Sequence, residues 1–141
     1  MVRRGLGVIV LAACAISQFA LLSGCGSSDR PKTIPVTGHV TVNGQAPGEP
    51  GKIFFAPTQA AAGYDKRPAS GGFTADGAYR VMSWEPDDGL VPGHYSVTVM
   101  PGNPSATKIP QKYLQINSSG LEVDVPVDQG PIEYNIELSA N

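Results

Sequence analysis

The chain has 141 residues, a formal net charge of −2 and only two cysteines, Cys14 and Cys25. Its basic residues are few and scattered, which argues against a nucleic-acid-binding protein. The part that follows Cys25 is long enough for one domain with one core, and without a further cysteine it has neither a disulfide nor a thiolate metal site. The 17 glycines and 13 prolines favour short strands joined by turns.

The N-terminal stretch has the pattern of a secretory signal. Two arginines near the start precede residues 6–22, which carry no charged side chain; these are the basic and apolar regions of a signal peptide. A transmembrane helix is the alternative, but a span needs about 20 apolar residues, and this run contains Ser17 and Gln18. We therefore expect residues 1–24 to be a signal peptide that is removed.

The end of this stretch reads Leu21-Leu22-Ser23-Gly24-Cys25 and resembles the lipobox of bacterial lipoproteins. The resemblance implies that Cys25 is acylated and becomes the N-terminus of the mature protein. A signal peptide with a chance cysteine is the alternative, but small residues in this order before Cys25 favour the lipobox. We expect an exported protein, anchored to a bacterial membrane and facing the periplasm or cell surface. Residues 25–35 are small, polar and proline-containing, which predicts a flexible tether.

The remaining chain, residues 36–141, is predicted to form one domain of short strands. Several segments alternate apolar and polar residues with a period of two, or are apolar throughout, as strands are. Asn43-Gly44 and Ala75-Asp76-Gly77 predict tight turns, and we expect Pro57 to end the second strand. The short apolar run before Pro57 indicates a central strand covered on both faces. The expected strands are residues 36–42, 53–56, 69–74, 78–82, 95–99, 121–125 and 132–138.

This spacing predicts an all-β fold, an immunoglobulin-like sandwich of two sheets with about seven strands. A closed barrel is the alternative, but two long loops make the strand spacing uneven. In the second long loop, Ile109, Tyr113, Leu114 and Ile116 are expected to fold one short turn onto the core. The side chains expected in the core are Val40, Val42, Phe55, Tyr79, Val81, Tyr95, Val97, Val99, Val123, Tyr134, Ile136 and Leu138.

Three segments share a further pattern: the strand and turn at residues 36–45, the hairpin at 73–79 and the strand at 92–99. In this order behind a lipobox they resemble the carboxypeptidase-regulatory-like, or transthyretin-like, domains of small lipoproteins from planctomycete-type bacteria. The resemblance covers nearly all of residues 35–138. It implies a transthyretin-like sandwich that serves as a non-catalytic binding or spacer module, with no catalytic residue and no cofactor.

The loop at residues 84–93 is the candidate ligand-binding site, because loops at the end of a rigid sandwich commonly carry function. Its acids Glu85, Asp87 and Asp88 could bind Ca²⁺ through oxygen atoms, but they lack the ligand spacing of an EF-hand. We favour a solvated turn in which aspartate bonds the loop backbone, and we predict no metal site. Trp84 could stack on a sugar ring.

Trp84 has a second interpretation. The sugar-stacking hypothesis would group it with Tyr64, Tyr79 and Tyr113, but a lone tryptophan more often anchors one end of a core. His39 and His94 lie in expected strands and are predicted to be surface residues. The acids Glu122, Asp124, Glu133 and Glu137 are predicted to form an outward, solvated set.

Taken together, these features predict a lipid-anchored, non-catalytic module of the cell envelope with a structural or interaction role. No turn of the G-x-S-x-G type, which would carry a nucleophilic serine, occurs in the chain. The alternative is a module that binds a glycan or another ligand through residues 84–93. The expected partners are the membrane, through lipid on Cys25, and an envelope protein or glycan of unknown identity.

Overall fold

The computed structural model describes residues 29–105 and 108–140. The predicted signal peptide and Cys25 lie outside the described residues. Contacts divide the chain into two units, Met1–Arg30 and Pro31–Asn141, and the second unit holds all the strands given below. Over the described ranges, no helix is long and apolar enough to cross a membrane.

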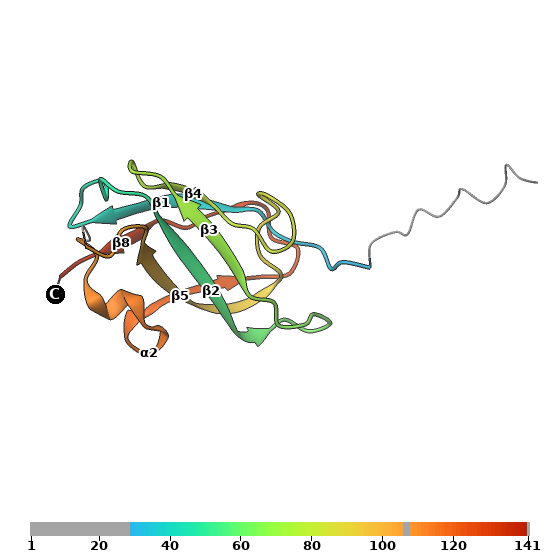
Figure 1. Ribbon diagram of the computed structural model, residues 1–141. Coiled ribbons are helices and arrows are strands. Elements are labelled where there is room, and N and C mark those ends of the chain that lie inside the picture. Colours follow the sequence, from blue (N-terminus) through green and yellow to red (C-terminus); the bar gives the residue numbers. More distant parts are fainter. Residues whose placement is uncertain (1–28, 106–107, 141) are drawn as a thin grey trace, which may run out of the picture. The chain divides into compact units, whose positions relative to one another are not determined.

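Strands dominate the second unit, so the all-β prediction is confirmed. Every segment predicted as a strand contains strand structure, and the last one is divided into two strands (Figure 1). Two short helical turns, η1 (Gln111–Leu114) and α2 (Ile116–Ser119), interrupt the second long loop. The strands are β1 (Val36–Val42), β2 (Gly51–Ala60), β3 (Ala69–Phe73), β4 (Ala78–Arg80), β5 (Gly93–Pro101), β6 (Leu121–Val125), β7 (Ile132–Glu133) and β8 (Ile136–Leu138).

The strands form one curled mixed sheet in the order β6-β5-β2-β3-β4-β1-β7, with β8 also paired to β1. β1 is antiparallel to β4 and parallel to β7 over its first residues, and it is parallel to β8 over Val40, Thr41 and Val42. Hydrogen-bonded neighbours connect all the strands, so the division into two separate sheets is not confirmed.

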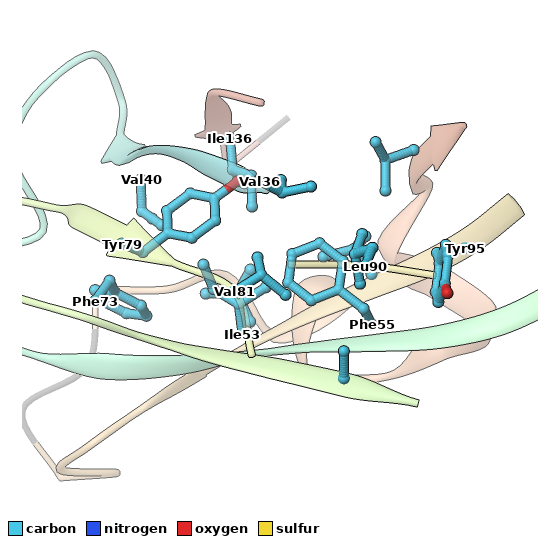
Figure 2. Packing of buried hydrophobic residues seen from close by; sticks show 14 of the residues in the cluster. Val36, Val40, Ile53, Phe55, Phe73, Tyr79, Val81, Leu90, Tyr95 and Ile136 are labelled. Carbon is cyan, nitrogen blue, oxygen red and sulfur yellow. The ribbon is translucent and has the colours of Figure 1, made fainter. Parts of the chain in front are cut away.

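The inner face of the curled sheet holds a single apolar cluster. In Figure 2 the labelled side chains of β1, β2 and β4 point into one common space. All the predicted core residues are buried except Tyr134, which is partly buried and packs against the cluster. Strand alternation was sufficient to find them because one face of each strand is inside. The core also contains buried side chains that were not predicted, among them Ile34, Leu90 and Ile109.

The folded part of the chain begins before residue 36. Ile34 is only 1% exposed, and its backbone exchanges two hydrogen bonds with Leu90, at 2.7 and 2.9 Å. Burying an isoleucine side chain contributes about 1.5–3 kcal/mol. The last residues of the stretch 25–35, which was expected to be a flexible tether, are therefore part of the fold.

Pro57 does not end the second strand, contrary to the prediction. β2 continues to Ala60, and its pairing with β5 shifts register between Pro57 and Gln59. Thr58 lies at this irregularity and donates a side-chain hydrogen bond to the carbonyl of His94 at 3.1 Å. Proline is tolerated at such a bulge because the ladder is already interrupted there.

β2 is central in the sheet, between β5 and β3, as predicted. The expectation that it is covered on both faces is wrong, because the outward ring of Phe54 is 39% exposed. The outer face of this part of the sheet therefore remains in contact with solvent.

The predicted strand at residues 132–138 is divided at Tyr134 and Asn135. There the Asn135 side chain replaces the backbone ladder and accepts a hydrogen bond from the His39 amide at 2.9 Å. The Tyr134 carbonyl crosses Gly38 so closely that a Cβ atom at that glycine would overlap it. The buried Tyr79 hydroxyl donates to the same carbonyl.

The second long loop folds onto the core, mostly as expected. Ile109 and Tyr113 are buried, and Leu114 packs partly buried against them. The Tyr113 hydroxyl accepts a hydrogen bond from the Ser139 amide at 3.1 Å, which joins η1 to the end of the chain. Ile116 is 44% exposed, so the expectation that it contacts the core is wrong. It starts α2, whose buried residue is Ser119.

Replacing Val97 or Ile136 by alanine is expected to lower the free energy of unfolding by about 1–4 kcal/mol, because each replacement leaves a cavity. Glu122→Ala should change it by less than about 0.5 kcal/mol, since the Glu122 side chain is 63% exposed. Urea denaturation measures all three variants. If all three replacements changed the free energy of unfolding equally, the assignment of Val97 and Ile136 to the core would be contradicted.

The buried tyrosines predict a loss of stability at alkaline pH. Burial raises the pKa of Tyr95 from 10.0 to about 12. Because the folded pKa lies above the unfolded one, the stabilisation is fully present below pH 10.0 and is lost as the pH rises to about 12. Melting temperature against pH tests this loss.

Tyr95→Phe supplies the comparison. It removes the titrating group and the hydrogen bond to the Val91 carbonyl, 2.7 Å long. At neutral pH the variant should lose about 1–2 kcal/mol, and its alkaline decline should be shallower than that of the original chain. Identical declines would show that Tyr95 does not titrate with unfolding.

Candidate functional site

The candidate loop connects β4 to β5 and lies beside the segment that leads into β1 (Figure 1, olive to yellow beside cyan). Gly89 has a φ of +91°, and a Cβ atom there would overlap the carbonyl of Ile34. Its amide donates to the Val81 carbonyl at 3.0 Å. Only glycine fits this close crossing without strain, so the loop is held against the first folded residues of the domain.

The Asp88 carboxylate organises the loop backbone. One oxygen, Oδ1, accepts from the Ser83 amide at 2.6 Å, and the other, Oδ2, accepts from the amides of Trp84 and Glu85, both at 3.0 Å. Ser83 Oγ donates to the Gly89 carbonyl at 2.6 Å and closes the turn. This geometry confirms the interpretation that an aspartate of the loop bonds its backbone.

Asp87 has a different role from its neighbour. Its φ of +65° is a left-handed conformation that aspartate tolerates. The side chain is 57% exposed, and its carboxylate lies 3.8 Å from the guanidinium of Arg80 on β4. The structure thus turns one aspartate into the loop and the other toward the outer face of the sheet. Across residues 29–105 and 108–140, no group of three or more His, Cys, Asp or Glu side chains is placed to hold a metal ion.

Trp84 is half-buried and is not part of the apolar cluster, so the interpretation as a core anchor is wrong. The Arg67 guanidinium stacks 4.5 Å from the centre of its ring, and Arg67 Nη2 donates to the Ser83 carbonyl at 2.9 Å. A cation over an indole face is a favourable contact. Arginine, rather than the core, therefore fixes the tryptophan.

The aromatic group suggested for sugar stacking does not assemble. Tyr79 and Tyr113 are buried in the core, at 4% and 5% exposure, and they cannot share a surface with Trp84. Tyr64 lies half-buried in the loop between β2 and β3. The reason is that Tyr79 lies on the inward face of β4 and Tyr113 is the buried residue of η1.

The histidines and the outward acids lie at the surface. His39 is exposed, and His94 is half-buried with its ring nitrogens 3.5 Å from Glu122 and 3.8 Å from Asp124 across the β5–β6 pair. The four acids are exposed as predicted. Glu122 and Asp124 lie on β6, Glu133 lies on β7 and Glu137 lies on β8.

An open trough of about 610 Å³ lies on the outer face of β3 and β4, and the sequence did not single it out. Its lining includes Lys52 of β2, Gly72 of β3, Arg80 and Met82, and it ends at Asp87 of the candidate loop. The alternation of β2 and β4 put Lys52 and Arg80 at outward positions. The order of the strands, which brings them to the same trough, could not be read from that alternation.

Asp88→Asn is expected to lower the free energy of unfolding by about 1–3 kcal/mol, because the amide group offers one acceptor where the carboxylate offers two. Asp87→Asn is the matched control. It should change stability by less than about 0.5 kcal/mol, since an exposed ion pair contributes little and asparagine tolerates positive φ. Chemical denaturation compares them, and equal losses would contradict the different roles assigned to the two carboxylates.

Comparisons with known proteins identify no relative of this chain. No protein-family model, no curated protein and no solved structure matches the chain. The resemblance of the three segments to carboxypeptidase-regulatory-like domains and the resemblance of residues 21–25 to a lipobox therefore stay predictions.

Proposed function

We propose that this chain is a lipid-anchored, non-catalytic module of the bacterial cell envelope, with Cys25 as its lipidated N-terminus. The feature that supports the proposal is the lipobox-like stretch at residues 21–25, and the structure adds that Ile34 already belongs to the core. Only nine residue steps separate Cys25 from Ile34, and a fully extended chain of that length spans at most about 30 Å. Such a link holds the domain next to the membrane.

The position of Ile34 also gives the domain an orientation in this proposal. The candidate loop is hydrogen-bonded to Ile34 through Leu90, so this end of the domain would be the one nearer the membrane. Figure 1 places α2 and the C-terminus at the other end. That end would point away from the lipid and toward an envelope partner.

The fold we propose is the transthyretin-like form of the immunoglobulin-like sandwich. Its support is the behaviour of β1, which pairs with β4 along its first half and with β8 along its second half, as a strand shared by two sheets would. The hairpin with Asp76-Gly77 at its turn supports it too, since it joins β3 to β4 in the order that the resemblance implies.

A second candidate function is the binding of a glycan or another ligand near residues 84–93. One observation favours it: Asp87 of this loop lines the open trough on the neighbouring sheet face. The ligand would then lie along the strands rather than over Trp84, whose ring is stacked against Arg67.

Cys25→Ser tests the anchoring. The variant should remain unprocessed and lose its partition into detergent, because stable anchoring needs two hydrophobic signals, as a diacylglyceryl group supplies. Cys14→Ser is the matched control and should leave processing unchanged, since Cys14 lies within the predicted signal peptide. Phase partition and mass spectrometry of the mature N-terminus measure both variants. A mature protein with an unmodified Cys25 would refute the proposal.

A further inference from the structure

On the outer face of the sheet, the neighbours of β3 carry longer side chains than β3. Its outward residues Ser70 and Gly72 are small and line the trough together with Lys52 and Arg80. Gly72 is directly opposite Lys52 in the β2–β3 pair. An added Cβ atom at Gly72 would meet nothing closer than the Gly51 carbonyl oxygen, at 3.9 Å. The lack of a side chain at Gly72 therefore leaves the trough open at this position.

Two cations flank that opening. The register that pairs Phe73 with Tyr79 and Ser70 with Met82 also brings Arg80 opposite Gly72, on the side away from Lys52. Neighbouring strands are about 4.8 Å apart, so the backbones that carry the two cations are about 10 Å apart. The Lys52 ammonium lies 5.4 Å from the centre of the Phe54 ring, and an anionic group above the glycine would draw this flexible side chain and that of Arg80 toward it.

The other lining groups limit the kind of anion. Asp87 lines the trough and its carboxylate lies 3.8 Å from the Arg80 guanidinium, so an anion bound there would share this cation with Asp87. The Asp87 oxygens also accept hydrogen bonds from hydroxyl groups. Ser70 offers a hydroxyl, and Met82, 43% exposed, offers an apolar surface. A ligand that combines carboxylates with hydroxyl donors and C–H faces fits this mixture. A run of acidic side chains on a peptide satisfies the cations but not Asp87.

From these contacts we propose that the trough over Gly72 binds an acidic polysaccharide, with a uronic-acid carboxylate between Lys52 and Arg80 and sugar hydroxyls near Asp87. The volume of about 610 Å³ is within the range of about 300–1,000 Å³ of small-ligand sites. The trough is open and follows a strand, which suits a chain rather than an isolated monosaccharide. This inference rests on the second candidate function above, for which it names the ligand class, and it does not depend on the lipid.

The experiment titrates tetragalacturonate into the purified chain, lipidated or not, by calorimetry and thermal unfolding. The melting temperature should rise with the concentration of the sugar, and binding should weaken as salt is added because the attraction is ionic. The methyl-esterified tetramer, which keeps the hydroxyls and loses the charges, should bind at least about tenfold more weakly, and so should poly-glutamate of equal charge.

Gly72→Val is the decisive variant. Because the position is open and outward in a strand, valine should fold as well as glycine and place a branched side chain between Lys52 and Arg80, and binding should weaken at least about tenfold. Lys52→Met and Arg80→Met should each do the same by removing a cation. Lys66→Met, in the loop between β2 and β3 and outside the trough lining, is the charge-matched control and should bind normally.

Three outcomes would overturn the inference. They are the absence of saturable binding to any acidic oligosaccharide tried, binding that Gly72→Val leaves unchanged in a folded protein, and poly-glutamate binding as tightly as the sugar. The last result would assign the trough to an acidic peptide instead. If Gly72→Val does not fold, the two methionine variants decide, since both positions are exposed. None of these results bears on Cys25 processing, so the two proposals fail separately.

Discussion

The closure of this fold depends on the backbone hydrogen bonds of one strand, β1. It pairs with β4 on one side and with β7 and then β8 on the other, so it connects the hairpin of the middle sequence to the end of the chain. At the crossing, Gly38 gives room for the Tyr134 carbonyl, and the Tyr79 hydroxyl satisfies that carbonyl from inside the core. A polar group buried at this place without a donor would be costly.

Much of the fold could be predicted from the sequence because a strand with one buried face shows a period of two. The segment with Val40 and Val42 and the segment with Val97 and Val99 were placed correctly for that reason. The bulge after Pro57 could not be predicted, since it depends on the register with β5. The burial of Ile34 depends on Leu90, which is distant in the sequence. Such pairings are fixed by the whole packing and leave no local pattern.

The candidate site shows the same difference between features that the local sequence predicts and features that tertiary packing decides. Asp87 and Asp88 are adjacent and chemically identical, and only the loop geometry turns one carboxylate to three backbone amides and the other to Arg80. Composition drew attention to this loop because it concentrates acids beside the lone tryptophan. It assigned Trp84 to the core, whereas Arg67 from another loop covers the ring. The trough was missed because its lining comes from β2, β3, β4 and the loop, and alternation alone does not say which strands are neighbours.

The backbone pairing of Ile34 with Leu90 also has a mechanical consequence. In the proposed arrangement, tension between the lipid anchor and a bound partner would enter the domain at Ile34 and act along β1, which begins two residues later. Inter-strand hydrogen bonds lie across the direction of such a pull, so they are loaded in shear and resist together instead of opening one after another. A domain anchored and bound as proposed would transmit force between a membrane and a neighbouring layer while its core remains folded.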